Sequence, residues 1–154
     1  MMVVAHVAVG AAVGSLTGDP VLAFLAGTAS HFAMDAVPHF DPGSFMPPGK
    51  EKYGIREYVW ASVDVVACLG FIAVLATHHA HPALIVAGGI GGLFPDAVLN
   101  TPFWKESTRK IPGFNWVQEH LHKGWHRTVL PQSWLAGVLT QLIAIGGSLW
   151  LLGF

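Results

Sequence analysis

Five long apolar stretches follow one another along this chain, and they constrain its fold more than any other feature. They cover residues 1–16, 20–37, 58–77, 82–100 and 133–154. A helix that crosses a bilayer needs about 20 predominantly apolar residues. The pattern therefore predicts an all-α fold in which residues 1–154 form a single transmembrane domain. We expect a polytopic membrane helical bundle of about five transmembrane helices.

The composition agrees with a lipid environment. Of the 154 residues, 53% are hydrophobic and only 11% are charged, whereas an ordinary soluble domain carries about 25% charged residues. A chain this short cannot bury so much apolar surface in one core. The net charge of −1 gives no indication of nucleic-acid binding, and the single Cys68 excludes an intramolecular disulfide.

The basic residues predict how the spans are oriented. Two tight turns and two long polar loops, 38–57 and 101–132, connect the apolar stretches, and alternation places both loops on one side of the membrane. The loops contain all eight basic residues: Lys50, Lys52, Arg56, Lys105, Arg109, Lys110, Lys123 and Arg127. The positive-inside rule assigns that side to the cytoplasm. We expect a multi-pass protein of the prokaryotic cytoplasmic (inner) membrane.

The second polar loop has features of a membrane surface. Trp104, Trp116 and Trp125 suit the aromatic belt at a membrane interface. Asn115 resembles an N-cap and Gly124 a C-cap. The loop is thus predicted to contain a short interfacial helix between these two residues.

Two histidines and two aspartates are concentrated in residues 30–41. His31 and Asp35 are spaced i,i+4 and therefore share one face of a helix. His39 and Asp41 follow Pro38, where that helix should end. Imidazole and carboxylate groups that converge on one point can bind a divalent metal ion. The segment therefore predicts a metal site.

Other ionisable residues of the apolar stretches lie toward the same side. His6, Asp64 and Asp96 all fall within about 10 Å of the basic loops along their helices. Each such residue costs about 2.5–3.5 kcal/mol in a membrane and usually marks function. Taken singly, His6 could be an interfacial histidine, Asp64 a structural partner and Asp96 a neighbour of a kink at Pro95. Their one-sided clustering favours a common site.

Two further histidine groups remain. His120, His122 and His126 lie in the second loop, either as additional ligands or as part of a solvated loop. On a helix His120 points away from His122, which makes it the weakest ligand candidate. The other group is in the turn on the opposite side, where we expect at most an adventitious metal site: His78, His79 and His81.

Several motifs resemble those of a known family. They are the early His6, Ser30-His31-x-x-x-Asp35, Pro38-His39-x-Asp41, Phe94-Pro95-Asp96 and His122-Lys123-Gly124-Trp125-His126-Arg127-Thr128. Together they resemble the membrane-bound metal-dependent hydrolases, also called LexA-binding, inner-membrane-associated hydrolases. The family's late motif is His-Arg-Gly-x-x-His-Ser; here His122 and His126 stand one residue closer and Thr128 replaces Ser. The motif style is also similar to zinc-dependent phospholipase C.

The resemblance implies the following site residues. The metal ligands are His6, His31, Asp35, Asp96 and His126, followed by His39, Asp41 and His122. Asp64 and Arg127 are the candidate catalytic residues. Basic residues suited to bind phosphate oxygens are Lys105, Lys123 and Arg127, although topology and attraction to anionic lipid explain them equally well. The ligand set without cysteine suits Zn²⁺, as two or more ions bridged by Asp35 or Asp41, and admits Mn²⁺ or Fe²⁺.

These features predict a membrane-embedded metal-dependent hydrolase. Its reaction would be that of a phosphoesterase, which hydrolyses a lipid or polyprenyl phosphate at the cytoplasmic leaflet through metal-activated water. Membrane lipid is then both environment and substrate, and the oligomeric state stays open. One alternative is a metal-ion or proton-coupled transporter that uses the same cluster. Another is a non-catalytic membrane scaffold.

Overall fold

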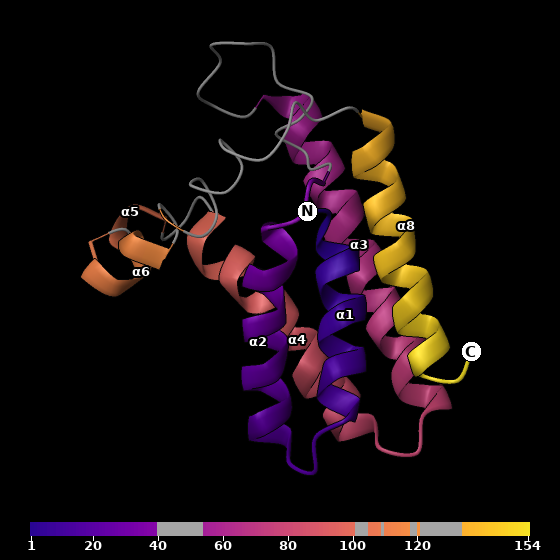
Figure 1. Cartoon of the computed structure of the whole chain (residues 1–154). Helices are drawn as coiled ribbons and strands as arrows, with labels where there is room; N and C mark the ends of the chain where they lie inside the picture. The colour runs from indigo at the N-terminus through magenta and orange to yellow at the C-terminus, as the bar shows by residue number, and fades with distance from the viewer. Residues whose placement is uncertain (40–53, 101–104, 109, 118–119, 121–133) are drawn as a thin grey trace.

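The computed structural model describes residues 1–39, 54–100, 105–108, 110–117, 120 and 134–154 (Figure 1). Within these ranges every regular element is a helix, and the predicted all-α fold is confirmed. The long helices are α1 (Val3–Ser15), α2 (Pro20–Asp35), α3 (Ile55–His78), α4 (Pro82–Asn100) and α8 (Trp134–Leu151). Two short helices, α5 (Lys105–Thr108) and α6 (Pro112–Val117), lie beside the bundle.

Each predicted apolar stretch forms one helix, but the helices differ in length. Among the helices of the described residues, only α3, with 24 residues, is long and apolar enough to cross a membrane by length and composition. The 13 residues of α1 extend about 20 Å at about 1.5 Å per residue, whereas the hydrocarbon core is about 30 Å thick. The expectation of five complete spans is therefore not confirmed by the helices themselves.

The turns follow from local capping. Asp19 is the N-cap of α2, and its Oδ1 accepts hydrogen bonds from the amides of Val21 at 2.8 Å and Leu22 at 3.0 Å. Pro20 occupies the first helical position, where its missing N–H is harmless. The predicted tight turn at this point is confirmed.

The predicted cap of the short interfacial helix is wrong. Helix α6 begins at Pro112, so Asn115 lies within the helix and not at its N-terminus. Proline is pre-organised for the first helical position, and this local preference outweighs the capping preference of asparagine. The predicted C-cap, Gly124, lies outside the described residues.

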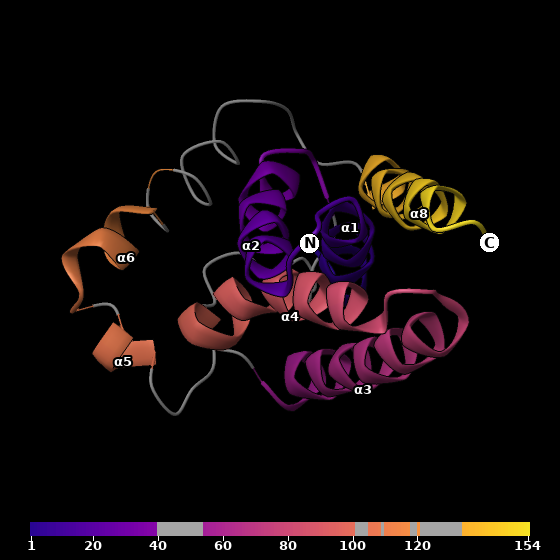
Figure 2. The ribbon, with the colours of Figure 1, turned by 90° about the horizontal axis from the view of Figure 1, so that it is seen from below.

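Helices α1, α2 and α4 pack closely around glycines (Figure 2). A Cβ atom added to Gly10 of α1 or to Gly27 of α2 would fall on the carbonyl oxygen of Gly88 in α4. A Cβ atom at Gly92 would fall on the carbonyl oxygen of His6. Small residues at such positions let helix backbones touch, which is common in membrane helix packing.

The bundle buries several polar groups beside a small apolar core, and it exposes many large apolar side chains. The described buried polar or charged residues are His6, His31, Asp35, His39, Glu57, Asp64, Gln141 and Ser148. Large apolar side chains on α3 and α8 are exposed, among them Val66, Leu69, Ile143 and Trp150. Only 17% of the apolar segment of α3 is buried within the bundle. Soluble domains rarely expose apolar surface on this scale, so α3 differs from the core helix of a soluble protein.

Candidate metal centre

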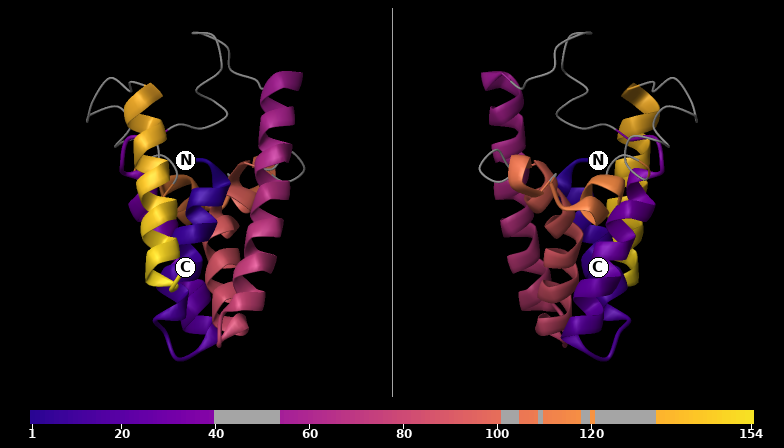
Figure 3. Two further views of the ribbon diagram at one scale, coloured as in Figure 1. Left: turned by 90° about the vertical axis from the view of Figure 1, so that its right-hand side faces the viewer. Right: turned by 90° about the vertical axis from the view of Figure 1, so that its left-hand side faces the viewer.

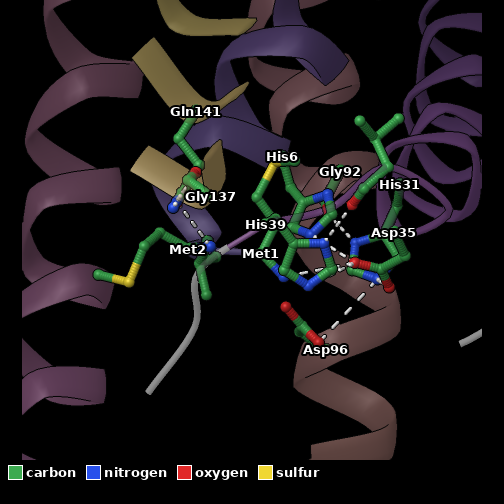
Figure 4. Close-up of polar contacts among 12 residues, drawn as sticks. Met1, Met2, His6, His31, Asp35, His39, Gly92, Asp96, Gly137 and Gln141 are labelled. Atoms are coloured by element: carbon green, nitrogen blue, oxygen red, sulfur yellow. Dashed lines mark hydrogen bonds and ion pairs between the residues drawn. The ribbon is translucent and has the colours of Figure 1, made fainter. Parts of the chain in front are cut away.

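Asp35, the last residue of α2, lies at the centre of a buried group of imidazoles (Figure 4). Its Oδ1 lies 3.1 Å from Nε2 of His6, and its Oδ2 lies 3.2 Å from Nε2 of His31. Nε2 of His39 lies 4.0 Å from Oδ1, and the amine nitrogen of Met1 lies 3.4 Å from the same atom. Two ligands of one tetrahedral zinc, each about 2.0–2.1 Å from the metal, are separated by roughly 3.3 Å. The two shorter separations are close to that value.

Backbone carbonyls orient two of the three imidazoles. Nδ1 of His31 lies 2.8 Å from the carbonyl oxygen of Gly92, and Nδ1 of His39 lies 2.8 Å from that of Val37. A carbonyl oxygen only accepts, so Nδ1 donates and Nε2 carries the lone pair of the neutral ring. Both Nε2 atoms face Asp35. Histidines that bind metals are usually held through the other ring nitrogen in this way.

His6 completes the group without any such anchor. Its ring is fully buried and stacks on that of His31, with ring centroids 3.9 Å apart. Neither ring nitrogen has a hydrogen-bond partner among the described residues, although Nε2 is 3.1 Å from Asp35. The distance is short, but the alignment is not that of a hydrogen bond. An unsatisfied buried polar atom costs about 1–3 kcal/mol, which a bound cation would relieve.

Asp96 approaches the group from α4. It follows Gly92 by one helical turn, and its Oδ1 lies 4.0 Å from Nε2 of His31. His6, His31 and Asp96 each offer a ligand atom, and these atoms lie within 4.8 Å of one another. The side chain of Asp96 is 18% exposed, compared with 2% for Asp35. Two nitrogens with carboxylate oxygens fit Zn²⁺ and also admit Mn²⁺ or Fe²⁺.

Pro95 does not interrupt α4 next to Asp96. Proline has no N–H to donate to the carbonyl of Gly91, four residues earlier. The hydroxyl of Thr28 in α2 donates to the Phe24 carbonyl of its own helix at 2.9 Å and lies 3.3 Å from the Gly91 carbonyl oxygen. A neighbouring helix thus brings a shared polar hydrogen near the carbonyl that proline leaves without its partner.

Asp64, a predicted catalytic residue, contacts the backbone of α1 instead. Its Oδ2 accepts a hydrogen bond from the amide of Val3 at 2.5 Å, and its Oδ1 accepts one from the amide of Val4 at 3.1 Å. The carboxylate is buried, and the Cys68 thiol is 4.0 Å away. Both oxygens are therefore used to cap a helix.

Of the remaining predicted site residues, one lies on the surface and the side chains of the others lie outside the described part of the chain. His120 lies on the surface, where its ring stacks on Trp116 and its Nδ1 is 2.9 Å from the Trp116 carbonyl oxygen. The side chain of Lys105, at the start of α5, is outside the described part of the chain, as are these predicted residues: Asp41, His122, Lys123, His126 and Arg127.

The sequence did not lead us to predict a role at the site for Gln141 or for Gly92. Gln141 is a buried amide within the last apolar stretch, and its Oε1 accepts a hydrogen bond from the amide of Met2 at 3.0 Å. A lone amide in an apolar helix is a signal that could have identified it. The role of Gly92 as acceptor for His31 depends on helix packing, and no local pattern indicates it.

Comparisons with protein-family models, curated proteins and solved structures found no match to this chain. The resemblance to membrane-bound metal-dependent hydrolases therefore remains a prediction based on the motif residues. Four of these, His6, His31, Asp35 and Asp96, meet at one buried point.

Proposed function

We propose that this protein is a multi-pass, membrane-embedded metal-dependent hydrolase of the family that its motifs resemble. Its reaction is that of a phosphoesterase, with a lipid or polyprenyl phosphate of the cytoplasmic leaflet as substrate. The observation that carries the proposal is the buried Asp35 centre, where Nε2 atoms of His31 and His39 face a carboxylate while their Nδ1 atoms are bound to carbonyls.

Three features support a position in the membrane. The apolar side chains of α3 and α8 point outward, the helices contact through glycines, and ionisable groups are inside the bundle. The shorter helices α1 and α2 would cross only part of a bilayer by themselves, so we infer that the bundle inserts as a unit around α3. The basic residues of the two polar loops support the cytoplasmic orientation.

The donor set suits a divalent metal ion. His6, His31, Asp35 and Asp96 would hold it. His39 could be a ligand of a second metal ion, because the two oxygens of Asp35 lie near different imidazoles. A divalent metal supplies Lewis-acid polarisation of a phosphoryl oxygen and a hydroxide nucleophile near neutral pH. Asp96 is the more exposed of the two carboxylates, and we infer that a phosphate group would approach the centre from its side.

The location of the centre suits a substrate anchored in lipid. The N-terminal end of α1 and the C-terminal ends of α2 and α4 meet at one end of the bundle, with α5 and α6 at a similar level (Figure 3). A lipid phosphate could reach this end while its tail stays in the bilayer. In this proposal the phosphate oxygens are bound by basic residues of the polar loops: Lys105, Lys123 and Arg127.

Metal analysis of the purified protein in detergent is the first test. Wild type should contain at least one zinc or manganese ion per chain by elemental mass spectrometry, and Asp35→Ala should lose it. Asp19→Ala, at the other end of α2, is the matched control and should keep the metal. Phosphate release from lipid and polyprenyl phosphates should then follow the metal content.

Two outcomes would overturn the proposal. A wild type that stays metal-free after zinc and manganese are supplied would exclude the metal centre. A protein that binds metal and carries it across liposome membranes, without releasing phosphate from any lipid phosphate, would instead be a transporter. A transport path would need further polar groups deeper in the bundle. Ser148, which is buried farther along α8 than Gln141, donates its hydroxyl to a carbonyl of its own helix. It therefore gives no support to such a path.

A further inference from the structure

The first turn of α1 is capped by side chains of two other helices. Met2, its N-cap residue, supplies no side-chain hydrogen bond, and the first amides of a helix have no partner within the helix. Asp64 of α3 accepts from the amides of Val3 and Val4, and Gln141 of α8 accepts from the amide of Met2 (Figure 4 shows the Gln141 contact). Three consecutive amides are thus satisfied from outside the helix.

Burying the carboxylate of Asp64 in order to cap α1 costs free energy. Asp64 is 2% exposed, and its hydrogen-bond partners in the described part of the chain are two amides and the Cys68 thiol. The positive end of the α1 dipole and the two amides stabilise the carboxylate there. Gln141 is also held, because its Nε2 donates to the Gly137 carbonyl at 3.2 Å. Both acceptors therefore have defined positions.

The same turn of α1 leads directly to His6. His31 and His39 are anchored through Nδ1 to carbonyl oxygens, whereas neither nitrogen of His6 has a hydrogen-bond partner among the described residues. The position of the His6 ring is therefore set by the α1 backbone, by stacking on His31 and by the approach of its Nε2 to Asp35. A shift of the first turn of α1 would move His6 relative to Asp35.

We propose that Asp64 and Gln141 are positioning residues of the metal centre. They hold the first turn of α1 against α3 and α8, and thereby fix His6 at the distance from Asp35 that a shared metal ion requires. This inference rests on the proposed metal-dependent function. It also assigns Asp64 a role through α1 in place of direct contact with substrate.

Zinc affinity measured by competition with a chelator tests the proposal. Asp64→Asn keeps the size of the side chain but replaces one acceptor by a donor, and it should weaken zinc binding roughly 10–100-fold, as loss of outer-shell partners typically does. Gln141→Leu should weaken binding about 10-fold, and Gln141→Glu should restore part of the affinity, because it keeps the acceptor for the Met2 amide but loses the donor to the Gly137 carbonyl. Ser148→Ala, another buried polar residue of α8, is the matched control and should bind zinc like wild type.

Two further measurements distinguish a positioning role from a general effect on the stability of the protein. In the cobalt-loaded protein, Asp64→Asn and Gln141→Leu should change the visible absorption spectrum, since the ligand geometry changes. In the His6→Ala background, Asp64→Asn should cause little additional loss of zinc affinity, because both act through one ligand. Equal losses in both backgrounds, or an unchanged cobalt spectrum with only a lower melting temperature, would overturn the positioning role.

The outcomes also separate this inference from the proposed function. If wild type binds zinc and the Asp64 and Gln141 variants retain its affinity, the positioning role fails while the metal-dependent function stands. If wild type binds no metal, the proposed function itself fails. Should Asp64→Asn not fold, Gln141→Leu and Gln141→Glu provide the same comparison.

Discussion

Two groups of three histidines lie at opposite ends of this bundle. His6, His31 and His39 are buried around Asp35. The other group occupies the turn between α3 and α4, where His78 and His81 are exposed. The residue type and number are the same in both groups, so any difference in chemistry arises from what surrounds the rings.

The turn histidines are bonded differently. His79 accepts the His81 amide at its Nδ1, at 3.1 Å, so its neutral ring carries the proton on Nε2. Nδ1 of His78 lies 2.9 Å from the Val74 carbonyl oxygen, and its ring centroid lies 5.9 Å from that of Phe154. In the Asp35 centre, the Nε2 atoms of His31 and His39 both face one carboxylate. Burial and convergence on an acid, rather than a high density of histidine, define the candidate site.

Removing two rings from each group gives the largest expected difference. His6→Ala with His31→Ala should reduce zinc affinity by more than about 100-fold, beyond the usual loss for an outer-shell partner. His78→Ala with His81→Ala should leave it unchanged. Chelator competition measures both, and a loss in the turn variant would show that the exposed group binds the metal.

The second-largest difference is expected between a glycine that lies in the contact of α1 with α4 and a glycine that faces open space. A Cβ atom in Gly92→Ala would fall on the His6 carbonyl oxygen, so we expect a loss of about 1–3 kcal/mol in stability from overpacking and about 10-fold in zinc affinity. Gly70→Ala on α3 meets open space and should stabilise by about 0.5–1 kcal/mol. Unfolding by SDS titration measures stability. Equal effects of the two substitutions would contradict the close approach of α1 and α4.

His39 provides a smaller and more selective comparison. Its Nε2 is 4.0 Å from Asp35, farther than those of His6 and His31. We expect His39→Ala to weaken zinc binding about 10-fold, as for an outer partner, or to remove one of two bound ions. His78→Ala is the matched control. Isothermal titration calorimetry reports both stoichiometry and affinity, and wild-type values for His39→Ala would exclude His39 from the centre.

Asp19, at the end of α2 opposite Asp35, gives the smallest expected effect. Asp19→Ala removes two hydrogen bonds from the N-terminal amides of α2 and should cost about 1 kcal/mol. Zinc affinity should not change, because the cap lies at the end of α2 opposite Asp35. Thermal unfolding measures the first expectation. A change in affinity would show that the two ends of α2 are coupled.

Much of the helical layout could be predicted because the signals are local. The apolar stretches, the turn at Asp19 and the stop before Pro38 depend on neighbouring residues and on side-chain spacing along one segment. The gathering of His6, His31, Asp35 and Asp96 at one end also follows from their distances to the helix ends. Whether α1 or α2 crosses a bilayer alone could not be read from apolar content, because the helices end before the apolar stretches do.

The sequence by itself determined the helices, their turns and the end of the bundle that carries the ionisable residues. Tertiary structure alone decided which nitrogen of His31 faces Asp35, since this ring is oriented by the Gly92 carbonyl of another helix. It also decided that Asp64 and Gln141 cap α1. Capping and spacing act within a few residues, whereas these contacts exist only because backbone-to-backbone packing at glycines brings distant helices together.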